Sequence, residues 1–134
     1  IFDENNYSTA CDMAVILHAA MENEICKKVL SARNYTTSCT QQHPQGITFS
    51  SKFLNRIDRK FGKGKVVGAK TGYVNQSRYC AVSMYESEAN NKYICVTGMA
   101  GKAWQTVYDH IAFTKIIVNE VYALVIKEIK DINK

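Results

Sequence analysis

Three segments between residues 65 and 99 constrain the fold of this chain more than any other feature of its sequence. In the second and third of them apolar side chains recur at every second position, which is the pattern of a half-buried β-strand. Only short connections join the three segments, whereas a parallel crossover needs a dozen or more residues. The sequence therefore predicts an antiparallel meander with strands at Lys65–Gly72, Arg78–Tyr85 and Asn91–Met99.

Helices are expected before this meander. Thr9 can cap a helix, with Asp12 as its capping-box partner, and apolar residues recur at helical spacing through 13–21. A second helical turn or two is expected around residues 25–30, where apolar positions continue. The polar segment 34–46 holds the only proline and is expected to be a loop, with at most a short extended piece.

Two further helices are expected on either side of the meander. The segment Ser50–Phe61 has apolar residues at helical spacing and ends at a glycine-containing turn. After the meander a long helix is expected from about Trp104, and its apolar stripe is expected to pack on the sheet. The stripe consists of Val107, Ile111, Val118, Val121, Val125, Ile129 and Ile132. Helices around an antiparallel sheet make the predicted fold class α+β.

The composition excludes several classes of function. The net charge is +5, but no run of like charges is longer than Lys27-Lys28 and no basic stripe is interleaved with aromatic residues. We therefore expect no nucleic-acid partner. The five cysteines include no Cys-x-x-Cys pair, and the three histidines show no ligand spacing. No metal site and no cofactor are expected from these patterns.

The first expected strand contains the triplet Lys70-Thr71-Gly72. Lys-Thr-Gly is one of three signature elements of the penicillin-recognising serine acyl-transferases, beside a Ser-x-x-Lys and a Ser-Asp-Asn. The sequence contains neither a Ser-x-x-Lys nor a Ser-x-Asn, and its only Tyr-x-Asn, Tyr73-Val74-Asn75, is fused to the triplet. The chain therefore looks like part of an enzyme that carries the carboxylate-binding strand without the nucleophile.

Two further segments resemble one family within this group. Tyr7–Ala14 resembles the YSTAxDMA helix start of the serine-type D-alanyl-D-alanine carboxypeptidases, which are the low-molecular-mass penicillin-binding proteins. Tyr73–Cys80 resembles the GYTxxAGxC segment of the same family, although Val74 replaces Thr and Ser77-Arg78 replaces Ala-Gly. The resemblance runs from Tyr7 to about residue 109 and fades beyond it.

This resemblance implies a partial fold. Residues 1–134 would form a C-terminal fragment of a penicillin-binding catalytic domain with a partial β-lactamase/transpeptidase-like fold. In that family one strand from the N-terminal part lies beside the strand that is here Asn91–Met99. In this chain alone that strand would be an open edge, and one apolar face of the sheet would be uncovered. Because an open edge favours pairing with another chain, a homodimer through 91–99 is expected.

The resemblance also implies an activity. The intact, extracytoplasmic parent would trim the terminal D-Ala from peptidoglycan stem peptides through an acyl-enzyme and would react with β-lactam antibiotics. Lys70, as the catalytic residue of this chain, would bind the substrate carboxylate together with Thr71. Gly72 would leave room for a substrate beside the strand, and the Tyr73 N–H would form half of the oxyanion hole. The nucleophile would lie upstream, so this chain alone is expected to be inactive.

Two alternatives remain open from the sequence. A fragment of a β-lactamase-type hydrolase would share Lys-Thr-Gly, but the Tyr7–Ala14 segment argues against it. A non-catalytic binding or assembly module of the same fold would have lost the nucleophilic half. A Ser-x-x-Lys encoded some tens of residues before Ile1 would favour the enzyme, and a start codon just before Ile1 would favour the module.

Overall fold

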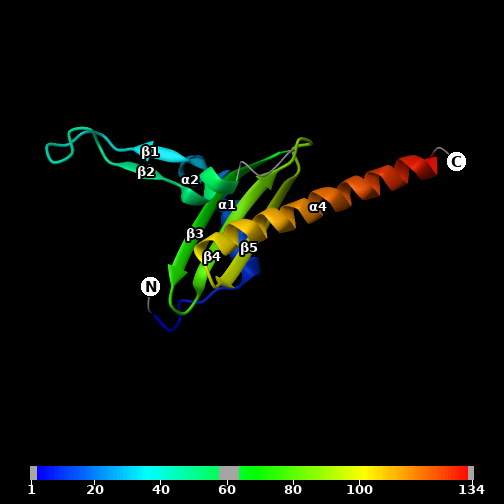
Figure 1. Cartoon of the computed structure of the whole chain (residues 1–134), viewed down its shortest axis with the longest axis horizontal. Coiled ribbons are helices and arrows are strands. Elements are labelled where there is room, and N and C mark those ends of the chain that lie inside the picture. The colour runs from blue at the N-terminus through cyan, green and yellow to red at the C-terminus, as the bar shows by residue number, and fades with distance from the viewer. Residues whose placement is uncertain (1–2, 58–63, 133–134) are drawn as a thin grey trace.

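The computed structural model describes the backbone of residues 3–57 and 64–132, and the side chains of these residues up to residue 118. Figure 1 shows how the helices and strands of this part are arranged. The elements are α1 (Ala10–Glu22), α2 (Glu24–Ser31), β1 (Asn34–Thr36), β2 (Thr48–Ser50), α3 (Lys52–Ile57), β3 (Lys65–Val74), β4 (Arg78–Glu86), β5 (Lys92–Ala100) and α4 (Ala103–Ile132).

The predicted meander is confirmed. Strands β3, β4 and β5 form an antiparallel sheet with β4 in the centre. Their bounds agree with the three expected segments apart from small differences at the ends. With helices on both sides of this sheet, the α+β fold class is confirmed as well.

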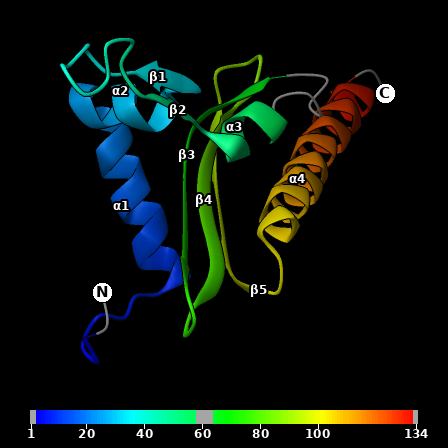
Figure 2. The same cartoon turned by 60° about the vertical axis from the view of Figure 1, so that its left-hand side comes forward.

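Helices cover both faces of the sheet. Figure 2 shows α1 on one side of the strands and α4 on the opposite side. The expectation of an uncovered apolar face is therefore wrong, because α1 packs on β4 and β5 while α2 packs on β3. Gly68 allows this close approach, since a Cβ at its position would lie 2.6 Å from Sδ of Met21.

Two hydrophobic cores follow from this layering. Alternate residues of β4 supply both, because successive side chains of a strand point to opposite faces. The α4-side core contains Phe53, Leu54, Ile57, Val66, Ala69, Ala81, Tyr85, Val107 and Ile111. The α1-side core contains Leu17, Met21, Val82 and Met84. The expected packing of the α4 stripe is confirmed for Val107, Ile111 and Val118, whereas the side chains of Val121, Val125, Ile129 and Ile132 lie outside the described residues.

Some expectations for the middle of the chain need correction. Strands β1 and β2 pair into a small antiparallel sheet where mostly loop was expected, and the hydroxyl oxygens of Thr36 and Thr48 lie 2.9 Å apart across it. Helix α3 begins at Lys52 rather than Ser50, and the end of the expected helix, residues 58–61, lies outside the described residues. No helix in the described part of the chain is long and apolar enough to cross a membrane.

The outer strand β5 is expected to pair with a second copy of the chain. It is hydrogen-bonded to β4 alone in the described sheet, so one row of its backbone N–H and C=O groups has no strand beside it. Such an edge favours association, most often as a two-fold dimer. Sedimentation should therefore detect a dimer or higher oligomer. A monodisperse monomer at high concentration, with the amides of 92–100 in fast hydrogen exchange, would contradict this expectation.

Candidate functional site

The first turn of α1 is fixed by reciprocal hydrogen bonds. The hydroxyl oxygen of Thr9 accepts from the Asp12 N–H at 3.1 Å. The Asp12 carboxylate accepts from the Thr9 N–H at 3.1 Å and from the Thr9 hydroxyl at 2.8 Å. These bonds, the side-chain bond from Thr9 first, lower the pKa of Asp12. The predicted capping box is thus confirmed, and it gives the Thr and Asp of the Tyr7–Ala14 motif a physical role.

A bulge in β3 determines which face of the sheet Lys70 occupies. The register with β4 shifts between Val66 and Gly68. Val66 and Ala69 both belong to the α4-side core, although strict alternation would place them on opposite faces. The extra residue therefore brings Lys70 to the α1 side, whereas a regular strand would turn it toward the α4-side core.

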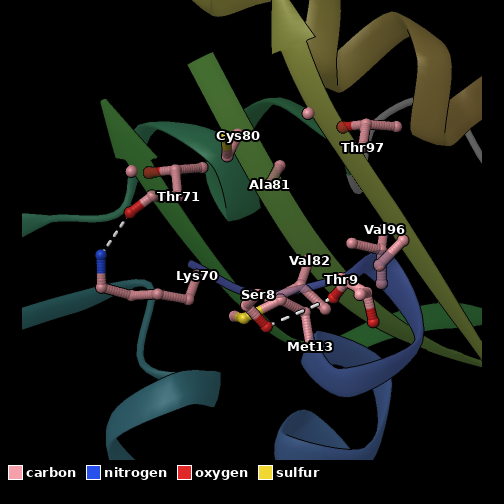
Figure 3. Close-up of a pocket in the computed structure, with 13 residues that line it drawn as sticks. Ser8, Thr9, Met13, Lys70, Thr71, Cys80, Ala81, Val82, Val96 and Thr97 are labelled. Atoms are coloured by element: carbon pink, nitrogen blue, oxygen red, sulfur yellow. Dashed lines mark hydrogen bonds between the residues drawn. The ribbon is translucent and has the colours of Figure 1, made fainter. Parts of the chain in front are cut away.

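A hollow of about 310 Å³ lies between the start of α1 and the strands of the sheet. Figure 3 shows side chains from α1 and all three strands around it. We call it the α1-side hollow. Its lining residues are Ser8, Thr9, Ala10, Met13, Lys70, Thr71, Gly72, Cys80, Ala81, Val82, Val96, Thr97 and Gly98.

Lys70 supplies the charge of this hollow. It is the one charged residue in the lining, which includes no carboxylate and no histidine. Its side chain is exposed, and its ammonium group donates to the backbone oxygen of Thr71 (Figure 3). It forms no ion pair with the described part of the chain. A cation without a counter-ion at the mouth of a largely apolar hollow favours an anionic ligand.

Gly72 keeps the floor of the hollow open. It lies opposite Cys80 in the β3–β4 register, and a Cβ at its position would meet no atom within 4 Å. Neither the packing of the protein nor the backbone conformation requires a glycine here, because Gly72 does not adopt a positive φ, so what the glycine provides is open space for a ligand. Any larger side chain there would project into open space beside Lys70.

Tyr73 differs from the other members of the predicted site. Its side chain does not line the α1-side hollow. Its ring lies 4.5 Å from that of Tyr79, and its hydroxyl donates to Oδ1 of Asn75 at 3.0 Å. The role expected for Tyr73 concerns its backbone N–H, and that role stays a prediction.

The structure adds residues that the sequence analysis did not assign to the site. Ser8, Thr9, Ala10 and Met13 border the same hollow as Lys70. The signal for them was present, since they lie in the motif at Tyr7–Ala14. The contributions of β4 and β5 had no such signal, because they depend on a register that shifts between Tyr79 and Ala81.

Other polar groups of the described residues lie away from the α1-side hollow, and His110 is an example. His110 is fully buried, with Ser83 Oγ 2.7 Å from its Nδ1 and Thr97 Oγ1 3.0 Å from its Nε2. No group of three or more His, Cys, Asp or Glu side chains gathers in the described part as a metal site would require. The five cysteines, all described, are free thiols.

Comparison with known proteins gives a match at the level of structure. No protein-family model and no curated protein matches the sequence. A solved structure of a D-alanyl-D-alanine carboxypeptidase from Mycobacterium tuberculosis H37Rv superposes with a TM-score of 0.55 and 20% sequence identity. The match covers 80% of this chain and 40% of that one, so the chain spans less than half of the solved protein. The described α+β architecture is therefore the fold of part of that structure.

Proposed function

We propose that this chain is the carboxylate-binding part of a serine D-Ala-D-Ala carboxypeptidase that acts on peptidoglycan stem peptides outside the cytoplasm. One observation carries the proposal: Lys70-Thr71-Gly72 borders the hollow that the capped start of α1 also lines. Two motifs that resemble the same family, separated by more than fifty residues in the sequence, thus meet at one site. The fold shared with a D-alanyl-D-alanine carboxypeptidase is consistent with it.

Each residue of the triplet has a distinct role in this proposal. The Lys70 ammonium and the Thr71 hydroxyl bind the terminal carboxylate of the peptide through charge-assisted hydrogen bonds. Gly72 gives the peptide access to the strand, and the N–H of Tyr73 stabilises the oxyanion of the tetrahedral intermediate. The nucleophilic serine, its partner lysine and the second serine come from sequence upstream of Ile1. The serine hydroxyl attacks the carbonyl carbon of the last peptide bond, that bond breaks, and the terminal D-Ala leaves with the proton on its amine. Water then hydrolyses the remaining acyl-enzyme and frees the serine.

A test of this proposal compares the chain with a longer protein that also includes the sequence encoded before Ile1. We expect the coding sequence before Ile1 to contain a Ser-x-x-Lys, and the protein that includes it to be labelled stoichiometrically by a fluorescent penicillin. The chain from Ile1 to Lys134 is expected to stay unlabelled, because covalent catalysis needs the missing nucleophile. Release of D-Ala from a peptide by the longer protein would separate a carboxypeptidase from a β-lactamase-type hydrolase, which would instead hydrolyse penicillin rapidly.

Two outcomes would contradict the proposal. A start codon directly before Ile1 would favour the non-catalytic binding module. Stoichiometric labelling of the chain alone would show that it carries a nucleophile of its own.

A further inference from the structure

A second hollow lies on the opposite face of the sheet, at the same end of β3. Its volume is about 590 Å³, and it is bordered by the β2–α3 junction, the first turns of α4 and the ends of β3 and β4. We call it the α4-side hollow. It shares Thr71, Gly72 and Cys80 with the α1-side hollow, so the two hollows meet at the Lys-Thr-Gly segment.

Aromatic rings form one part of the α4-side hollow. Tyr73 and Trp104 remain 54% and 41% exposed, although other groups hold both rings in place. The ring of Tyr73 packs on Tyr79, and the guanidinium of Arg56 lies 4.1 Å from the centroid of the Trp104 ring. Aromatic rings that neighbouring groups fix in place, and whose surfaces remain accessible, are suited to packing against the apolar parts of a ligand.

Lys52 is the charged residue that borders this hollow. Its side chain forms no ion pair or hydrogen bond with the described part of the chain, and no carboxylate is among the lining residues. By contrast, the hydroxyls of Ser50 and Thr106 already donate to protein acceptors. The charged side chain in the lining of this hollow is therefore Lys52, as Lys70 is in the α1-side hollow, whereas the guanidinium of Arg56 stacks on Trp104 and donates to the Tyr108 hydroxyl.

We propose that the α4-side hollow is a subsite for a second carboxylate of the same peptide. The terminal carboxylate binds at Lys70, the peptide passes over the open position of Gly72, and an acidic residue a few positions earlier pairs with Lys52. The aliphatic part of that acidic residue packs on Tyr73 and Trp104. The inference rests on the proposed function and adds a preference for acidic peptides.

The test compares two peptides on the whole chain by NMR titration. The probes are acetyl-Glu-Ala-D-Ala-D-Ala and its Gln counterpart, which differ by one carboxylate. We expect the Glu peptide to bind about fivefold more tightly, as a partly exposed ion pair allows, and to shift the Trp104 indole signal. Lys52→Gln should abolish the difference between the peptides. Lys65→Gln, at the far end of β3 and outside both hollows, should retain it.

The outcomes separate this inference from the proposed function. If both peptides bind equally tightly, and if Lys70→Ala weakens the binding of both to the same extent, the second subsite is overturned while the carboxylate site at Lys70 stands. A preference for the Glu peptide that survives Lys52→Gln would also overturn it. Failure of both peptides to bind would contradict the proposed function and this inference with it.

Discussion

Lys70→Ala in the protein that includes the upstream nucleophile is expected to slow acylation by penicillin about 100-fold or more, as loss of one charged donor from such a site typically does. The physical reason is that Lys70 is the one cation lining the α1-side hollow, and no other lining residue can replace its charge. The fold should be unaffected, because the Lys70 side chain is exposed and donates its hydrogen bond to the neighbouring Thr71.

Acylation kinetics with a fluorescent penicillin measure this effect directly. Lys65→Ala is the matched control, since Lys65 is an exposed lysine of the same strand but lies outside the hollow. The melting temperature of both variants should match that of the parent. Unchanged acylation in the Lys70 variant would remove this residue from the site.

Lowering the pH from neutral to about 4 is expected to reduce the free energy of unfolding by about 3 kcal/mol through the protonation of His110 alone. Burial lowers the pKa of His110 from 6.5 to about 4, while the charge of Asp109 and a hydrogen bond with the backbone of Ala81 act in the opposite direction. Above pH 6.5 the ring is neutral in the folded and unfolded chains alike. Below it the unfolded chain binds a proton that the folded chain resists, so stability falls between about pH 6.5 and 4 and this contribution then levels off.

The location of His110 explains why its protonation disturbs the fold. Its ring joins α4 to Ser83 of β4 and Thr97 of β5 and makes an edge-on contact with Phe53 of α3 at 5.3 Å between ring centroids. Charging the ring would leave a buried cation among hydroxyls and apolar groups. Helix α4 is therefore expected to loosen from the sheet first.

Urea unfolding from pH 7.5 to 4 tests this expectation. His110→Gln should be less stable at neutral pH and should show a flatter dependence on pH than the unmodified chain. His43→Gln is the control, because His43 is exposed in the connection between β1 and β2 and belongs to neither hydrophobic core. The same steep loss of stability in the His110 variant would show that other groups cause it.

The sequence predicted those parts of the fold that local patterns determine. Alternation in 78–85 and 91–99 with short connections was sufficient for the meander, because strand register there follows from which face is buried. Thr9 and Asp12 predicted the start of α1, since a capping box acts within three residues. The triplet Lys70-Thr71-Gly72 was also assigned to a strand correctly.

Features that depend on contacts between distant segments could not be predicted. The bulge after Val66, which brings Lys70 to the α1 side, appears in the sequence only as two consecutive valines. The pairing of β1 with β2 joins two segments of three residues each, too short for a periodic signal. The buried position of His110 depends on hydroxyl partners on two strands, so its spacing in the sequence gives no indication of it.

The central claim is that the Lys-Thr-Gly segment binds the terminal carboxylate of a peptide. The most direct measurement is an NMR titration of this chain with acetyl-Lys-D-Ala-D-Ala and with its C-terminal amide, following the backbone amides of 70–73. The free acid should shift these signals and the amide should not. The Gly72→Val variant should keep the fold, because a Cβ at this position meets no atom within 4 Å, but its signals should no longer respond to the free acid. Equal shifts with acid and amide, or shifts confined to other parts of the chain, would contradict it.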